Sequence, residues 1–299
     1  MTHRSWPPLP LADWVATRDT LQMWSQIVGK ICLALTPRVN HFWNIALQVT
    51  PRGLVTPTLA AGSRTLTMTF DFVSHELEIL LSDGTREAIP LRPQTVADFY
   101  RTLTETLHRL GIEVRIWRMP VEVPDPIRFD LDTVHRSYDA EAVQRFRDVL
   151  LAITPVLQEF RAGFIGKCSP VHFFWGSFDL AVTRFSGRRA PDRPGADIIT
   201  RESYSHEVIS HGWWPGGGPL SEPAFYAYAA PEPEGLKTAA IAPAAAYYNT
   251  DLSEFILPYE AVRRAANPEA DLRAFLDTTY DVAARLAGWD RATLERTPA

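Results

Sequence analysis

Apolar side chains recur at helical spacing in four long stretches of this 299-residue chain, and each stretch predicts an amphipathic helix. Gly29 follows the first stretch and is expected to close that helix, because glycine readily adopts the left-handed conformation of a helix end. Pro155 lies inside the third stretch, where we expect a kink. The predicted helices cover residues 11–28, 95–110, 140–164 and 269–286.

Between the helices, shorter runs of β-branched and aromatic residues predict strands. Ser74-His75-Glu76 and Asp83-Gly84 separate neighbouring runs and are typical of hairpin turns. Short strands joined by such turns pair antiparallel, so the sequence predicts an α+β fold of mainly antiparallel sheet with flanking helices. The predicted strands cover residues 41–50, 65–73, 77–81, 86–90, 112–119, 172–183, 225–228, 244–248 and 255–257.

The order of elements and several short motifs occur twice along the chain. Thr36-Pro37 is matched by Ser169-Pro170, and Ser74-His75-Glu76 by Ser205-His206-Glu207, in the same order. This pattern predicts an internal duplication with pseudo-two-fold symmetry. The two related α+β units would cover residues 1–125 and 126–299, with enlarged loops at 186–248 in the second unit.

The predicted strand at 172–183 carries an acidic residue, Asp179, within a run of aromatic residues. Alternate residues of a strand face opposite sides. One face then carries core residues, whereas the other carries Trp175, Ser177, Asp179, Ala181 and Thr183, a mixed set that suits the wall of a groove. A carboxylate in apolar surroundings needs a partner, and Arg184 or Arg188 is the expected one.

Basic residues flank this strand at both ends. Lys167 lies before it, and Arg184, Arg188 and Arg189 come at its end or just after. Together they predict a site for a small anion, a carboxylate or a phosphate, that guanidinium groups would bind through paired hydrogen bonds. The alternative is that these arginines are simply solvated. His172 and Trp175 complete the expected ligand-binding set on the strand.

Three titratable residues are candidates for acid–base catalysis: Asp179, His206 and Glu207. A zinc site at His206, Glu207 and His211 is not expected, because H-E-x-x-x-H does not place both histidines on one helix face. We therefore predict no metal and no cofactor.

Trp213 and Trp214 precede Pro215 and three glycines, so the sequence predicts a flexible hinge with an aromatic tip. In the first hypothesis this segment forms a lid over a small-molecule site. In the second, the protein is a non-catalytic interaction module in which Trp213, Trp214 and the segment at 225–228 bind a protein partner. Whether the protein is an enzyme stays open at this point.

Composition narrows the classes of partner. With 46% apolar and 22% charged residues the chain is typical of a folded soluble protein, and its net charge of −5 argues against nucleic acid. Two cysteines fit a reducing cytoplasm. We find neither a signal peptide nor a membrane-spanning run, and we expect a cytoplasmic protein of open oligomeric state.

The run IGKCSPVHFFWGSFDLAVTRFSGRRAP, with YSHEV and PEPEG further on, resembles a family of uncharacterised bacterial proteins known only as a domain of unknown function. The resemblance extends from PLADW near the start to AGWDRATLER near the end. It implies a bacterial source. It implies no activity and no site residue, because the family has no established function.

Overall fold

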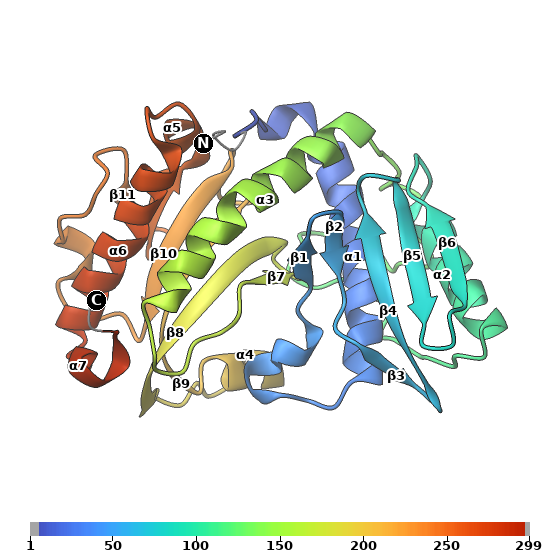
Figure 1. The fold of residues 1–299 in the computed structure, drawn as a ribbon, viewed down its shortest axis with the longest axis horizontal. Helices are drawn as coiled ribbons and strands as arrows, with labels where there is room; N and C mark the ends of the chain where they lie inside the picture. The colour runs from blue at the N-terminus through green and yellow to red at the C-terminus, as the bar shows by residue number, and fades with distance from the viewer. Residues whose placement is uncertain (1–5, 297–299) are drawn as a thin grey trace.

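The computed structural model describes residues 6–296 and contains two six-stranded antiparallel sheets with flanking helices (Figure 1). The predicted α+β class is therefore confirmed. Both halves run from a long helix through a series of antiparallel strands to another helix, and the duplication itself stays a prediction. None of the described helices is long and apolar enough to span a membrane.

The first sheet packs one face against two helices, α1 (Val15–Leu35) and α2 (Val96–Arg109). Alternate residues such as Met68, Phe70 and Ile79 are buried on that face, while Glu76 and Glu78 lie on the outer face. The strands are β1 (Gln48–Thr50), β2 (Gly53–Val55), β3 (Leu59–Ala61), β4 (Arg64–Asp71), β5 (Glu76–Leu81) and β6 (Arg86–Pro90).

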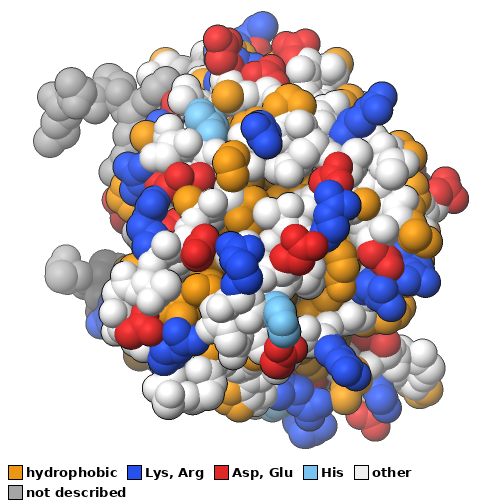
Figure 2. Space-filling model, turned by 90° about the vertical axis from the view of Figure 1, so that its right-hand side faces the viewer, with side chains coloured by type: hydrophobic (Ala, Val, Ile, Leu, Met, Phe, Trp, Pro, Cys, Tyr) orange, Lys and Arg blue, Asp and Glu red, His pale blue; other side chains and the backbone are white. Residues whose placement is uncertain are grey.

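The side of the molecule where β6 and α2 lie carries interspersed acidic and basic side chains (Figure 2). Arg86 pairs with both Glu76 and Glu78 there, and Arg109 of α2 pairs with Glu87 of β6. The outer charges of the first sheet are thus neutralised locally in water.

The second sheet is covered by helices α3 (Ala140–Ala162) and α6 (Pro268–Leu286), which cross one face (Figure 1). We call this the helix face, and the opposite side the cavity face. The strands are β7 (His172–Phe174), β8 (Asp179–Arg189), β9 (His206–Trp214), β10 (Ala224–Ala230), β11 (Tyr247–Asn249) and β12 (Glu254–Pro258). Short helices α4 (Ile198–Ser203), α5 (Tyr259–Arg263) and α7 (Arg291–Leu294) and the 3-10 segments η1 (Leu11–Asp13), η2 (Asn40–Ile45) and η3 (Leu236–Thr238) complete the fold.

The two halves meet at Leu47 and Phe173, whose backbone amides each donate to the other residue's carbonyl, at 2.9 and 2.8 Å. A single cluster of buried apolar side chains includes residues of both sheets and of the helices between them. The boundary between the units at residue 125 stays a prediction, and the contacts here join both halves into one core.

The first helix is longer than predicted, because Gly29 does not close it. The helix continues to Leu35, and Gly29 serves a packing role inside it. A Cβ atom at position 29 would lie 2.2 Å from ring atoms of Trp175, so only glycine lets that indole lie against the helix. The indole Nε1 of Trp175 then donates to the carbonyl of Ile45 over 2.9 Å.

The predicted strands at 41–50 and 112–119 are wrong in whole or in part, and of the one at 244–248 only the end is a strand, β11 (Tyr247–Asn249). Residues 41–50 form η2 followed by the short β1, with positive φ angles at His41 and Phe42 that a strand does not allow. Residues 112–119 alternate as a strand would, and Val114 and Ile116 pack on the core. The segment nevertheless forms no strand within the described residues. An extended segment can bury alternate side chains without pairing, and the sequence pattern does not distinguish the two cases.

The aromatic segment at 172–183 is a hairpin, not one strand: β7 and β8 are joined by a turn in which Phe178 has a φ of 61°. The predicted hinge at 212–218 is also wrong in its first part. Trp213 and Trp214 belong to β9, and Trp213 is fully buried against Phe146 and Tyr259, because this part of β9 pairs with strands on both sides.

Candidate functional site

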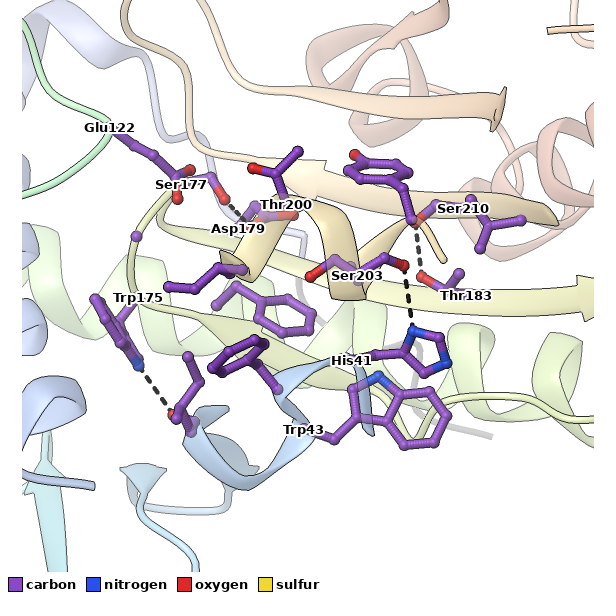
Figure 3. Close-up of a pocket in the computed structure, with 18 of the residues that line it drawn as sticks. His41, Trp43, Glu122, Trp175, Ser177, Asp179, Thr183, Thr200, Ser203 and Ser210 are labelled. Atoms are coloured by element: carbon purple, nitrogen blue, oxygen red, sulfur yellow. Dashed lines mark hydrogen bonds between the residues drawn. The ribbon is translucent and has the colours of Figure 1, made fainter. Parts of the chain in front are cut away.

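A cavity of about 360 Å³ lies on the cavity face of the second sheet (Figure 3). It is closed by η2, by α4 and by the loop that carries Val121 and Glu122. Most of its lining residues come from the sheet itself and from η2. The lining residues used below are His41, Trp43, Glu122, Trp175, Ser177, Asp179, Tyr204, Tyr226 and Tyr228.

The alternation of β8 decides which residues reach this cavity. Asp179, Ala181 and Thr183 line it, whereas Leu180 and Val182 are buried on the helix face. Trp175 and Ser177 of the preceding turn also line the cavity. The mixed face of this hairpin therefore forms one wall of an enclosed space.

Asp179 is the most deeply placed charged group of the cavity, with 7% of its surface exposed. Ser177 Oγ donates to Oδ1 over 2.9 Å, and the Tyr226 hydroxyl donates to Oδ2. Burial raises the pKa of Asp179 to about 6, although both hydrogen bonds act in the opposite direction. The carboxyl can therefore exchange a proton near neutral pH.

Tyr226 reaches Asp179 across β9, because position 212 is a glycine. A Cβ atom on Gly212 would lie 2.4 Å from the Tyr226 hydroxyl oxygen. This close approach requires glycine at position 212, although glycine in the interior of a strand weakens the strand.

Two further carboxyls lie near Asp179. Burial raises the pKa of Glu254 to about 7, and the nearby charge of Asp179 adds to the shift. Glu122 is exposed as a residue, but its carboxyl is partly desolvated where it reaches Gly176 at the cavity wall, and this desolvation raises its pKa. Within residues 6–296, the ion pairs of the molecule involve none of these three acids. The cavity therefore has an acidic end without a neutralising cation.

Aromatic side chains form the walls beside this acidic end. Tyr226 and Tyr228 stack with their ring centroids 6.1 Å apart, and the hydroxyls of Tyr204 and Tyr228 lie 2.9 Å apart. Trp43 and Trp175 line the opposite wall. Aromatic faces next to carboxylates are the surroundings that organic cations prefer.

The other end of the cavity holds His41, which is 5% exposed. Its Nδ1 lies 3.0 Å from the Glu202 carbonyl and 3.2 Å from the Ser203 carbonyl, so Nδ1 carries the proton and donates. Its Nε2 lies 2.6 Å from Lys167 Nζ and accepts from that ammonium group. Burial, and then the charge of Lys167, lower the pKa of His41, which fits a neutral ring.

Backbone strain gathers around the cavity. Of the seven non-glycine residues with positive φ within residues 6–296, three line it, namely His41, Phe42 and Glu122, and Phe178 lies between two lining residues. Such conformations cost free energy and cluster at functional sites. This observation is independent of the charges and points to the same place.

Arg184 and Arg188, expected beside Asp179, are not there. Arg184 belongs to the helix face, where its Nη2 donates to the Phe160 carbonyl and its guanidinium carbon lies 3.5 Å from the Phe160 ring centroid. Arg188 pairs with Glu207 over 2.7 Å and donates to the Ala287 and Gly288 carbonyls at the end of α6. The predicted partners of Asp179 are therefore wrong, since Tyr226 and Ser177 take that place.

The three candidate catalytic residues do not converge. Glu207 is bound to Arg188 and to Ser186. His206 is half-buried, and its ring centroid lies 5.9 Å from that of His41. Asp179 alone lines the cavity.

The remaining candidates lie outside the cavity wall. Lys167 is exposed and is not a lining residue, but its Nζ contacts His41 and lies 5.5 and 5.0 Å from the ring centroids of Trp43 and Phe185, which line the cavity. His172 is 4% exposed, and its burial lowers its pKa to about 4. Trp213 packs in the core, and Trp214 is half-buried away from the lining residues.

Several residues in or near the cavity were not singled out from the sequence: His41, Glu122, Tyr204 and Tyr226, which line it, and Glu254, which lies near Asp179. For Tyr226 a signal exists, because FYAYAA alternates large and small residues and puts Tyr226 and Tyr228 on one face. Glu122 and Glu254 come from distant loops and strand ends, and no local pattern predicts their approach. Across residues 6–296, His, Cys, Asp and Glu side chains form no group of three or more that could hold a metal ion.

The comparisons with known proteins identify a family without assigning a function. The model of a family described as "Family of unknown function (DUF5996)" matches residues 6–296, so the chain belongs to that family. No curated protein and no solved structure matches the chain. A function must therefore be argued from the cavity.

Proposed function

We propose that this member of a family of unknown function binds a small organic molecule in the cavity of the second sheet, through a ligand amine or hydroxyl group that donates to Asp179. The observation that carries the proposal is a buried carboxyl that forms no ion pair with any residue of the described part of the chain. Burying a carboxylate without a counter-charge is unfavourable, and perturbed groups of this kind are enriched at functional sites.

The size and the walls of the cavity support this proposal. About 360 Å³ is at the lower end of the range for small-molecule sites. Tyr204, Tyr226, Tyr228 and Trp175 offer aromatic faces, and the carboxyls of Asp179 and its neighbours offer negative charge. A primary amine attached to an aromatic or aliphatic body fits both features.

The sequence favoured an anionic ligand in a cleft of the second unit. For this cavity we propose the opposite charge, because Arg184 and Arg188 point elsewhere and the groups near Asp179 are acids. With a pKa of about 6, Asp179 is also suited to take up or release a proton of a bound molecule. The interaction-module hypothesis loses its motivation, because Trp213 is buried.

A binding screen with matched probes tests the proposal. We expect benzylamine or tyramine to raise the melting temperature at pH 7.5, and benzoate of similar size to leave it unchanged. Asp179→Asn should weaken amine binding by about 10-fold or more in calorimetry, because a charged hydrogen bond is lost. Asp13→Asn, an exposed carboxyl outside the cavity, is the control. Equal affinity in wild type and Asp179→Asn would remove the proposed role of Asp179.

A further inference from the structure

A second cavity, of about 440 Å³, lies on the helix side of the second sheet, between α6, α7 and the end of α3. Its innermost charged group is Arg184, which is 4% exposed. The guanidinium carbon lies 3.5 Å from the ring centroid of Phe160 and 4.2 Å from that of Tyr280. Arg184 Nε is buried and has no hydrogen-bond partner among the described residues. A buried cation with an unused donor therefore borders an open space.

The acids of this cavity are engaged by other arginines. Asp277 pairs with Arg273 over 2.6 Å, and Arg291 holds both Asp281 and Glu295, at 2.5 and 2.6 Å. Four arginines and three carboxylates line the space, so the positive charge is in excess.

Arg184 and Arg296 are the two arginines of this cavity that take no part in these ion pairs. Arg184 Nη2 donates to the Phe160 carbonyl, and Arg296 Nε donates to the Ala162 carbonyl over 2.9 Å. Both arginines thus bind carbonyls at the end of α3, and neither has a carboxylate partner within residues 6–296. Asp277 and Glu295 lie near enough to act on the charge of Arg184, but both are bound to other arginines. The neutral carbonyls and aromatic rings in contact with Arg184 therefore compensate its buried guanidinium only in part.

We propose that this second cavity binds a small oxyanion, a carboxylate or a phosphate, with Arg184 as the central ligand and Arg296 at the rim. A planar guanidinium with a free Nε–H offers the donor geometry that such oxygens accept in pairs. The site is separate from the cavity of Asp179, because neighbouring residues of β8 face opposite sides of the sheet.

The test is calorimetric titration of the full chain with inorganic phosphate and with citrate, in a zwitterionic buffer with sodium chloride at matched ionic strength. Calorimetry is needed because phosphate also stabilises proteins by exclusion from their surface. We expect one of these anions to bind at one site. Arg184→Lys keeps the charge but loses the paired donors, and it should weaken binding by about 10-fold or more.

Further variants keep the test decisive. Arg296→Ala changes an exposed residue at the rim, so it should fold even if Arg184→Lys does not, and it should weaken binding by a smaller factor. Arg285→Ala, on the exposed side of the same helix α6, and Asp179→Asn should bind the anion like wild type. The proposal is overturned if neither anion binds, or if Arg296→Ala binds as tightly as wild type. A loss confined to Arg188→Ala would also overturn it, because it would assign the anion to the exposed loop.

Discussion

The two sheets differ in the face that is not packed against long helices. In the first sheet that face is in water, and its acids are paired: Arg86 contacts Glu76 and Glu78. Nearby, hydrogen bonds from Thr85 and from Arg64 lower the pKa of the Asp83 carboxyl to about 2. In the second sheet the corresponding face is enclosed, and burial raises the pKa values of Asp179 and Glu254.

The direction of these shifts separates structural acids from candidate functional ones. An acid with a lowered pKa is stabilised in its charged form by the fold, whereas an acid with a raised pKa is held at a cost to stability. Such a cost persists in natural proteins where a function requires the group. The comparison therefore marks the second sheet as the one that carries a site.

The largest expected effect comes from the packed face of the first sheet. Phe70 is 1% exposed, and Phe70→Ala should lower the free energy of unfolding by about 3–5 kcal/mol because it leaves a cavity in the core. Urea unfolding measures this loss. Amine affinity of the folded protein should stay unchanged, and a selective loss of affinity would mean that the first sheet also contributes to the site.

At Asp179 we expect a substitution to raise the free energy of unfolding instead of lowering it. Asp179→Asn should raise the free energy of unfolding at pH 7.5 by about 3 kcal/mol, because a pKa raised from 3.8 to about 6 corresponds to that penalty on the charged form. Urea unfolding of both proteins at pH 7.5 measures it. A destabilised Asp179→Asn would place this acid in the same class as Asp83.

A smaller gain in the free energy of unfolding is expected from a substitution of Glu254. Its carboxyl has a raised pKa of about 7, but the residue is only half-buried, so solvent reduces the energetic effect. Glu254→Gln should stabilise the protein by about 1–2 kcal/mol at pH 8. Asp179→Asn should lower the pKa of Glu254, because the charge of Asp179 is one cause of the Glu254 shift. Thermal unfolding at pH 8 and carboxyl NMR titration measure the two effects. An unchanged Glu254 pKa in Asp179→Asn would mean that the two acids act independently.

The smallest effect should come from Arg86 on the outer face of the first sheet. Although Arg86 contacts two acids, its side chain is 50% exposed, and exposed ion pairs contribute little in water. Arg86→Ala should change the free energy of unfolding by less than about 1 kcal/mol, and less still in high salt. Urea unfolding at two salt concentrations measures this, and a loss of several kcal/mol would contradict the contrast between the two faces.

Local pattern was sufficient for much of the fold. The helices at 95–110, 140–164 and 269–286 and the short strands at 225–228 and 255–257 could be predicted, because each depends on its own apolar periodicity. The end of α1 could not be predicted, because Gly29 is needed for the close packing of Trp175, a residue distant in sequence, and not for ending the helix. Residues 41–45 likewise look like a strand but adopt a strained 3-10 turn held by tertiary contacts.

For the cavity, alternation along the β8 segment indicated which residues share a face with Asp179. It could not indicate which charged groups meet there. Arg184 is five residues from Asp179 and therefore lies on the other face, whereas Tyr226 and Glu254 arrive from later strands. The sign of the charge around Asp179 depends on which strands pair with β8 and its neighbours, and the local sequence does not show this. The sequence therefore predicted an anion site where the structure brings acids together.

The most direct test of the central claim is the free energy of unfolding of wild type and Asp179→Asn between pH 4 and pH 7. The folded-state pKa of Asp179, about 6, lies above the unfolded value of 3.8, so its ionisation destabilises the fold as pH rises. The stability advantage of Asp179→Asn should grow from near zero at pH 4 to its full value above pH 6. An advantage that is constant across this range, or that shrinks as pH rises, would contradict the account.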